Sequence, residues 1–173
     1  MLFNSFDFLI FIAIFFCIYW FVIPKDKFYQ NLLLLAGSYI FYGWWDYRFL
    51  SLIIASTLVD FFVAKFVHKN TDSKLKKFGL TFSLIFNLGL LFTFKYFNFF
   101  VDSFSNLFSI QSGSSNFLLL DVILPVGISF YTFQTLSYTI DVYNKKIKPT
   151  NNIIDLAVYV SFFPQLVAGP IER

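Results

Sequence analysis

The chain has 173 residues, of which 58% are hydrophobic and 24% are aromatic, while only 13% are charged. Soluble domains carry about 25% charged residues, so this chain has too few charges for the solvent-exposed surface of a soluble protein. Its large apolar fraction excludes a disordered protein, and its single cysteine excludes a disulfide-stapled domain. The charges lie between apolar runs rather than along one face, which argues against nucleic acid as a partner. The composition therefore predicts an all-α, polytopic transmembrane protein.

Six apolar stretches follow one another along the chain, and a helix that crosses a bilayer needs roughly 17–25 mainly apolar residues. Five of them are good candidates for spans: 8–24, 28–45, 49–64, 78–101 and 122–140. The sixth, 156–171, is short and contains two prolines, so a spanning helix and a re-entrant helix both remain open. We therefore expect five to six spans, with residues 102–120 forming an external loop that is rich in serine and asparagine.

The lysines predict how these spans are oriented. They gather in three connections, 24–29, 65–77 and 144–150, whereas the intervening connections carry little positive charge. Cytoplasmic loops of membrane proteins carry an excess of lysine and arginine. The lysine-rich loops are therefore expected in the cytoplasm and the N-terminus outside, with the lipid bilayer as the surrounding partner.

Polar side chains within the apolar stretches are the first places to look for function, because they are costly in hydrocarbon and usually face protein or water. Asp60 lies in the third stretch, one turn after Thr57 and on the same face of a helix. Asn87 lies in the middle of the fourth stretch. For both we favour a structural role, because amides and small polar groups commonly join membrane helices.

The fifth stretch carries a polar stripe. Gly127, Tyr131, Gln134, Tyr138 and Asp141 are separated by four, three, four and three residues, which places them along one face of a helix. Such a stripe must face protein or water in a membrane. A buried hydrogen-bonded seam and the wall of a polar cavity are equally good interpretations of this pattern.

The last stretch breaks its helix at Pro164 and again at the Gly169–Pro170 pair, which leaves Gln165 and Arg173 near unsatisfied backbone groups. Broken helices of this kind are tolerated at membrane depth where they line a cavity. The only histidine, His68, lies in a lysine-rich segment and is expected to be a solvated loop residue. No metal-ligand cluster or nucleophile motif is found, so we predict no catalytic residue and no metal site in this chain.

Four segments of the chain resemble the membrane-bound O-acyltransferase family, in its bacterial alginate and peptidoglycan O-acetyltransferase branch. They are STLVDFFVAK (56–65), NLGLLFTFKYFNFF (87–100), LPVGISFYTFQTLSYTIDVY (124–143) and YVSFFPQLVAGPIER (159–173). Together they cover most of the chain from the third stretch onward. The third and fourth segments are the most specific. The branch that transfers D-alanine to teichoic acid is also similar and remains an alternative within the family.

The resemblance implies an enzyme of the bacterial inner membrane that moves an acyl group from a cytoplasmic donor, acetyl-CoA or another acyl thioester, to an extracytoplasmic polysaccharide. It also implies periplasmic acetyltransferase partners and a catalytic histidine that lies downstream of the part matched here. Residues 1–173 would then be the N-terminal portion of a larger helical bundle, inactive alone and completed by the remainder of the acyltransferase chain. We expect no bound cofactor, and we expect substrate contacts from Gln134, Tyr138, Asp141, Gln165 and Arg173.

An interpretation from a different class stays open. The polar stripe and the broken last helix also occur in transporters, so the chain could be a complete small membrane subunit or a channel-like scaffold.

Overall fold

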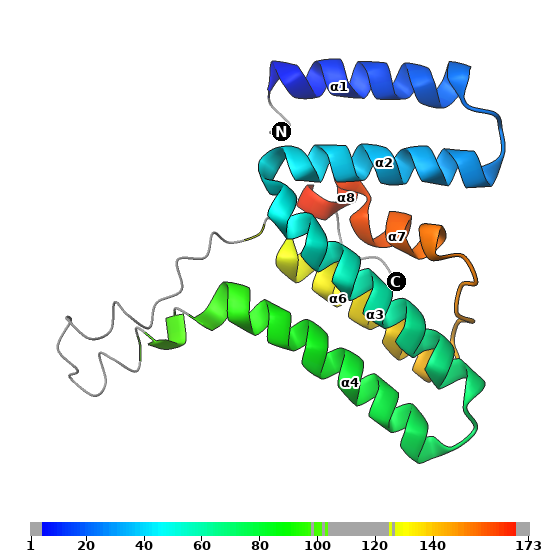
Figure 1. Ribbon diagram of the computed structural model, residues 1–173, viewed down its shortest axis with the longest axis vertical. Coiled ribbons are helices and arrows are strands. Elements are labelled where there is room, and N and C mark those ends of the chain that lie inside the picture. Colours follow the sequence, from blue (N-terminus) through cyan, green and yellow to red (C-terminus); the bar gives the residue numbers. More distant parts are fainter. Residues whose placement is uncertain (1–4, 98, 102, 104–124, 126, 169–173) are drawn as a thin grey trace.

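The computed structural model describes residues 5–97, 99–101, 103, 125 and 127–168, and in these residues it contains helices and no strand (Figure 1). The helices are α1 (Phe6–Cys17), α2 (Lys27–Asp46), α3 (Leu50–Lys69), α4 (Ser73–Leu91), α6 (Ile128–Tyr143), α7 (Ile153–Ser161) and α8 (Phe163–Ala168). A π-helical turn, Ile18–Val22, continues α1, and another, Phe92–Tyr96, continues α4. A 3-10 turn, Tyr47–Phe49, joins α2 to α3.

Short polar side chains fix where four of these helices begin. Ser5, Asp26, Asp72 and Asn152 each stand just before a helix and accept a hydrogen bond from a backbone N–H in its first turn. Such capping stabilises a helix end, typically by about 1 kcal/mol. Asp26 and Asp72 lie within the lysine-rich connections 24–29 and 65–77, and Asn152 follows the third, so helix starts and positive charge come from neighbouring residues.

The helices are arranged around α3, which lies beside α6 and crosses α4 (Figure 1). Helices α1 and α2 run side by side at one end of the molecule, and α7 and α8 lie between α2 and α6. Aromatic rings join the outer helix to the rest: the rings of Phe11 and Phe41 both pack against Phe163 of α8, with centroids 5.6 and 5.3 Å away. Most residues of the buried apolar core belong to α3, α6 and α7.

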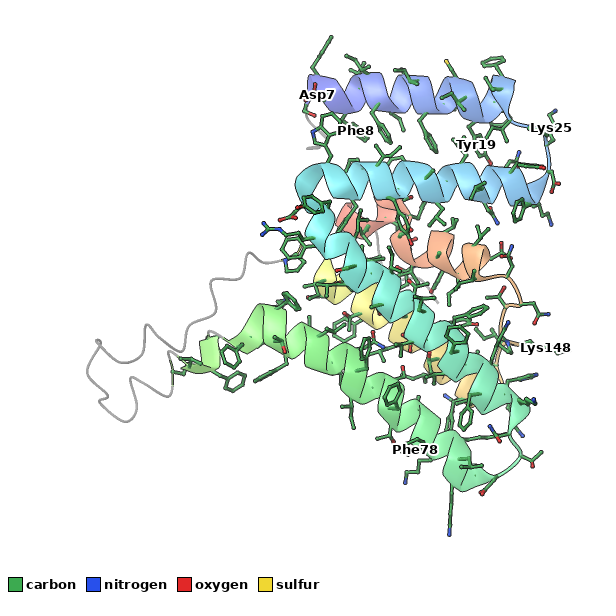
Figure 2. All side chains as sticks on the ribbon, viewed as in Figure 1. Asp7, Phe8, Tyr19, Lys25, Phe78 and Lys148 are labelled. Atoms are coloured by element: carbon green, nitrogen blue, oxygen red, sulfur yellow. The ribbon has the colours of Figure 1, made fainter. Side chains whose placement is uncertain are left out.

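Two helical segments of the described residues, Tyr47–Lys69 and Ser73–Tyr96, are long and apolar enough to cross a membrane by length and composition. Helix α1 with its π-helical extension is apolar but shorter. Large apolar side chains cover the outward faces, as in α4, where Phe78 is 69% exposed and points away from the other helices (Figure 2). The protein is therefore an all-α membrane protein, and the number of its spans stays a prediction.

The last helical stretch divides as its proline predicts. Helix α7 ends at Ser161 and α8 begins at Phe163, with Phe162 between them in a non-helical conformation. The backbone N–H of Phe163 donates to the hydroxyl of Ser38 in α2 at 3.3 Å, which satisfies one donor at the break. The second expected break, at Gly169–Pro170, lies outside the described residues, as does the expected external loop at 102–120 apart from residue 103.

Gly127 sets how closely α6 approaches α8. Its φ of +76° lies in the left-handed region, and a Cβ added there would stand 2.9 Å from the carbonyl oxygen of Leu166. Glycine is suited to such a position because it lacks the Cβ. Gly127 thus starts α6 at a place where the backbone of α8 leaves no room for a side chain.

The lysine-rich segment 65–77 is mostly helical, which corrects the expectation of a loop. Helix α3 continues through His68 to Lys69, and α4 begins at Ser73, so only three residues connect them. His68 is exposed in the last turn of α3, where a basic side chain suits the partial negative charge of the helix end.

Candidate functional site

Helix α6 presents two different polar faces. The hydroxyls of Thr132, Thr135 and Thr139 are buried, and Thr135 bonds to residues of α3 and α4. Gln134, Tyr138 and Asp141 lie toward α7 and the connection 144–152. The stripe expected from the sequence therefore covers only the second face, and the threonine face was not anticipated.

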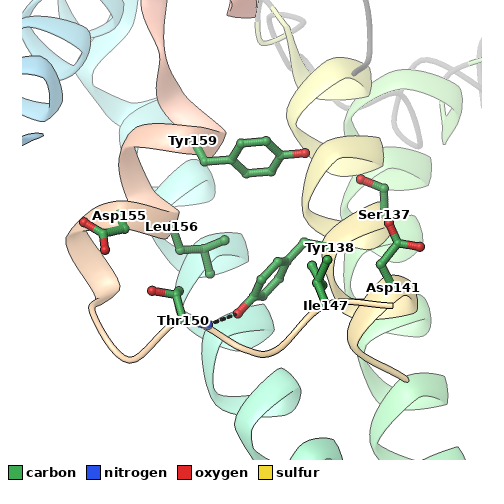
Figure 3. A pocket seen from close by; sticks show the side chains of 8 residues that line it. All are labelled: Ser137, Tyr138, Asp141, Ile147, Thr150, Asp155, Leu156 and Tyr159. Carbon is green, nitrogen blue, oxygen red and sulfur yellow. Dashed lines mark hydrogen bonds between the residues drawn. The ribbon is translucent and has the colours of Figure 1, made fainter. Parts of the chain in front are cut away.

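The second face borders a pocket of about 290 Å³ between α6 and α7 (Figure 3). Helix α6, the connection that follows it and α7 all contribute to its wall. The lining residues are Ser137, Tyr138, Asp141, Ile147, Thr150, Asp155, Leu156 and Tyr159. The wall thus combines aliphatic and aromatic surface with hydroxyls and two carboxylates, a mixture typical of small-molecule sites.

Hydrogen bonds hold the pocket wall in shape. The hydroxyl of Tyr138 accepts a hydrogen bond from the backbone N–H of Thr150 at 3.1 Å, which ties α6 to the following connection (Figure 3). Asp155 accepts hydrogen bonds from the side-chain amides of Asn31 at 2.8 Å and Asn152 at 3.2 Å. These bonds fix the start of α7 against both α2 and its own cap.

The charges at the pocket are partly neutralised within it. Asp141 forms an ion pair with Lys146 at 3.4 Å, and both side chains reach solvent. Lys145 and Lys148 are exposed on the same connection as Lys146. In the described residues no group of three or more metal-ligating side chains occurs.

Gln134 lies behind the pocket rather than in its wall. Its side-chain N–H donates to the backbone carbonyl of Tyr159 at 2.6 Å, so it joins α6 directly to α7. The carbonyl oxygen of the same side chain, Oε1, is buried and has no hydrogen-bond partner within the described residues. Gln134 therefore supports the wall at Tyr159 while keeping an acceptor free.

The threonine face of α6 meets a buried polar crossing of three helices. Asp60 of α3 is fully buried and accepts hydrogen bonds from two residues of α4, the hydroxyl of Ser83 and the side-chain amide of Asn87, the latter at 2.9 Å. Asn87 in turn accepts from Ser56 at 2.5 Å, and the hydroxyls of Ser56 and Thr135 are 3.2 Å apart. The structural roles expected for Asp60 and Asn87 are thus confirmed. Thr57 is buried as well, and its hydroxyl donates to the carbonyl of Ile53 in its own helix.

The remaining expected site residues are not brought to this pocket. Gln165 lies partly buried in α8, outside the pocket wall, where its backbone N–H donates to the carbonyl of Phe162 at 3.0 Å. Arg173 lies outside the described residues. Of the five residues expected to contact substrate, Tyr138 and Asp141 share the pocket and Gln134 stands behind it.

The five lining residues that lie between 147 and 159 were not predicted from the sequence. Their signal is weak but present: the Asn152 cap followed by Asp155 marks a helix start beside a lysine-rich connection. The threonine face also had a signal, since Thr132, Thr135 and Thr139 recur at intervals of three and four residues.

At the other ends of the helices, Asp46 and Arg48 form a close ion pair at 2.9 Å in the turn between α2 and α3. Hydrogen bonds from the side chain and backbone N–H of Arg48 hold the pKa of the Asp46 carboxyl below its usual range. This pair leaves that turn without net charge, in contrast to the lysine-rich connections.

Comparison with known proteins finds relatives in one enzyme class. The chain is 44% identical over 146 residues to a probable alginate O-acetylase of Pseudomonas syringae, a match that covers 84% of this chain and 28% of the relative. It is 41% identical over 175 residues to a probable alginate O-acetylase of Pseudomonas putida, covering 100% of this chain and 35% of the relative. A peptidoglycan O-acetyltransferase of Helicobacter pylori is 33% identical over 171 residues, which cover 85% of this chain and 32% of the relative.

No family model and no solved structure matches the chain. The names of these relatives give the same enzyme class that the four segments indicate. The chain spans about a third of the length of these curated relatives. The chain therefore belongs, as a part of that length, to the membrane-bound O-acyltransferase family, in its alginate and peptidoglycan O-acetyltransferase branch.

Proposed function

We propose that residues 1–173 form the N-terminal portion of a membrane O-acyltransferase that acetylates an extracytoplasmic polysaccharide of the alginate or peptidoglycan type. The names and identity of the relatives support this activity. The remainder of the acyltransferase chain would supply the catalytic groups, and this portion would supply a wall of the path between donor and acceptor. It would be inactive alone.

The observation that carries this proposal is the pocket between α6 and α7 beside a lysine-rich connection. We propose that it is the donor-side mouth of the path and takes the arm of an acyl thioester such as acetyl-CoA. Its aliphatic and aromatic wall suits the apolar part of such an arm, and Tyr138 and Thr150 offer hydrogen bonds to its amides. The exposed lysines at 145 and 148 suit phosphate groups at the entrance.

The orientation in the inner membrane is part of the same proposal. Lys25, in the turn between α1 and α2, and Lys148, in the connection before α7, lie toward the same side of the molecule (Figure 2). The short connection between α3 and α4 lies on that side as well (Figure 1). This arrangement supports a cytoplasmic location for the three lysine-bearing connections, with acetyl donor on that side and polysaccharide and periplasmic partners on the other.

The proposal is tested by filling the pocket with a larger side chain. The substitution is made in an acetyltransferase that contains residues 1–173 and has the full length of the relatives. Ser137→Phe places a ring in the pocket from the wall of α6, so we expect at least a tenfold loss of acetyl transfer, seen mainly as a raised KM for the donor. Thr81→Phe, at an exposed position of α4, is the matched control and should leave transfer unchanged.

Acetylation is measured on the isolated polysaccharide, and the amount of each variant in the membrane is measured in parallel. Equal activity of Ser137→Phe and Thr81→Phe at equal abundance would show that the donor does not use this pocket. Asp141→Asn and Gln134→Ala extend the test to the rest of the polar face. We expect a smaller loss for Gln134→Ala because that side chain stands behind the wall.

A further inference from the structure

Asp60 is a buried acid that the proposed path does not use. Its side chain is fully buried at the crossing of α3, α4 and α6, inside a segment long and apolar enough to cross a membrane. All of its closest polar neighbours are uncharged. Ser83 and Asn87 of α4 donate to it, and the hydroxyls of Thr135 and Thr139 of α6 lie against it.

No cation neutralises this carboxyl group in the part of the chain that the structure describes. The basic group closest in sequence, the ammonium of Lys65, lies over the ring of Phe61 at 4.1 Å and donates to the carbonyl of Asn151 at 3.4 Å. On α6, the hydroxyl of Tyr138 accepts from the backbone N–H of Thr150, and Asp141 pairs with Lys146. On α7, Asp155 accepts from two asparagines. The ion pairs of the described residues do not include Asp60.

An ionised carboxylate in such surroundings is expensive. Moving an ion from water into a protein interior costs several kcal/mol even after relaxation, and hydrogen bonds from neutral groups offset only part of it. Buried ionisable groups without a countercharge take up or release a proton instead. The absence of a nearby cation therefore favours the neutral acid.

The hydrogen bonds around Asp60 leave one hydroxyl that can accept a hydrogen bond from a protonated carboxyl group. The hydroxyl of Thr139 is buried beside Asp60 and has no hydrogen bond of good geometry within the described residues. The hydroxyls of Ser56 and Thr135, by contrast, have acceptors in Asn87 and in the backbone carbonyl of Thr132. A proton on Asp60 would supply Thr139 with a donor and leave the bonds from Ser83 and Asn87 in place.

We propose that Asp60 is a proton-binding site within the membrane, where its carboxyl is held as the neutral acid and donates to the hydroxyl of Thr139. Ser83 and Asn87 each donate to one carboxyl oxygen, which leaves a lone pair for a proton, and the described residues hold no group of three or more metal-ligating side chains. The site joins three helices through uncharged groups alone, and it stands independently of the proposed acyl-donor pocket.

Infrared spectroscopy of the purified protein tests this directly, because a protonated carboxyl has a carbonyl stretching band that a carboxylate lacks. At neutral and mildly alkaline pH we expect this band in the unmodified protein and its loss in Asp60→Asn. Asp7→Asn, which changes an exposed carboxyl in the first turn of α1, should leave the band unchanged. Absence of the band from the unmodified protein, or its persistence in Asp60→Asn, would overturn the proposal.

Thermal unfolding in detergent supplies a second readout that does not depend on spectral assignment. Asparagine is the neutral isostere of the acid and keeps a donor toward Thr139, so Asp60→Asn should lower the Tm by only about 2–4 °C. Asp60→Ala removes both hydrogen bonds that Ser83 and Asn87 donate to the carboxyl group and should lower the Tm by on the order of 10 °C. Equal losses in the two variants would mean that the negative charge itself is required, which contradicts a bound proton.

Discussion

The two polar faces of α6 carry similar residues but differ in what they form with the neighbouring helices. At the crossing with α3 and α4, hydroxyls and amides bond to one another around the buried carboxyl group of Asp60. Toward α7, Tyr138 and Asp141 bond to the following connection and leave a pocket of about 290 Å³ between the helices. The difference lies in what each face meets: a long straight neighbour closes the first, and a short broken helix leaves the second open.

This contrast suggests a general lesson about polar side chains in membrane helices. A polar group in hydrocarbon must be satisfied by protein or water, whichever its helix face meets. Periodicity reveals that such a face exists, but the neighbouring helix decides whether it becomes a seam or a cavity. Substitutions at the closed crossing and at the open pocket should therefore differ in the size and kind of their effects.

The largest effect on stability is expected at the closed crossing. Asn87→Ala removes the amide that donates to Asp60 and the acceptor that Ser56 uses. Leaving buried polar groups without partners should lower the free energy of unfolding by about 2–4 kcal/mol. Thermal unfolding in detergent measures it, with Leu88→Ala on the exposed side of α4 as the control. A loss no greater than that of the control would mean that the crossing does not hold the helices together.

The start of α6 should be nearly as sensitive, because both polar faces depend on its position. Gly127→Ala forces a Cβ into the left-handed region and against the carbonyl oxygen of Leu166, which should cost about 1–3 kcal/mol of stability. Gly89→Ala is the matched control, since a Cβ there meets nothing within 4 Å, and it should be neutral or stabilising. If both variants unfold at the same temperature, α8 does not constrain α6.

A substitution in the wall of the open pocket should lower the free energy of unfolding by a smaller amount. Tyr138→Phe removes only the hydroxyl that accepts from the backbone N–H of Thr150. The loss of one hydrogen bond should lower the free energy of unfolding by about 1 kcal/mol, while donor binding should weaken more clearly because the connection is released. Parallel measurements of Tm and of donor KM separate the two. A variant with a large Tm loss and unchanged KM would place Tyr138 in a seam instead of a substrate wall.

The smallest effect is expected at the turn between α2 and α3. The Arg48 side chain holds the pKa of Asp46 low in the folded protein, so the pair stabilises the fold at pH values above the ordinary carboxyl pKa. That stability is lost as the pH falls through the lowered pKa of the folded state. Asp46→Asn should therefore reduce the Tm slightly at neutral pH and not in strong acid. An equal difference at both pH values would exclude the ion pair as its cause.

Much of this organisation could be predicted from the sequence. The inward face that Asp60 shares with Thr57, the role of Asn87 between helices and the break next to Pro164 all follow from helical spacing and backbone chemistry. These features depend on one helix at a time, so a single sequence contains them.

The division of the α6 stripe could not be predicted in the same way. Gln134 and Tyr138 lie on one face of the helix, yet one supports the pocket wall from behind and the other lines it. That outcome depends on where α7 begins, which is set by the Asn152 cap and by the bond between Asn31 and Asp155 across the fold. Contacts between residues far apart in the sequence leave no periodic signal.

The central claim, that an acyl donor enters the pocket between α6 and α7 from the lysine-rich side, is tested most directly by thiol protection. Ser137→Cys and Thr81→Cys are placed separately in a full-length enzyme in which Cys17 is replaced by serine, and membrane-impermeant thiol reagent is applied to each side of sealed membranes. We expect labelling of Ser137→Cys from the cytoplasmic side, slowed by acyl thioester, and labelling of Thr81→Cys that the donor does not change. Labelling of Ser137→Cys from the periplasmic side, or no slowing at saturating donor, would contradict the account.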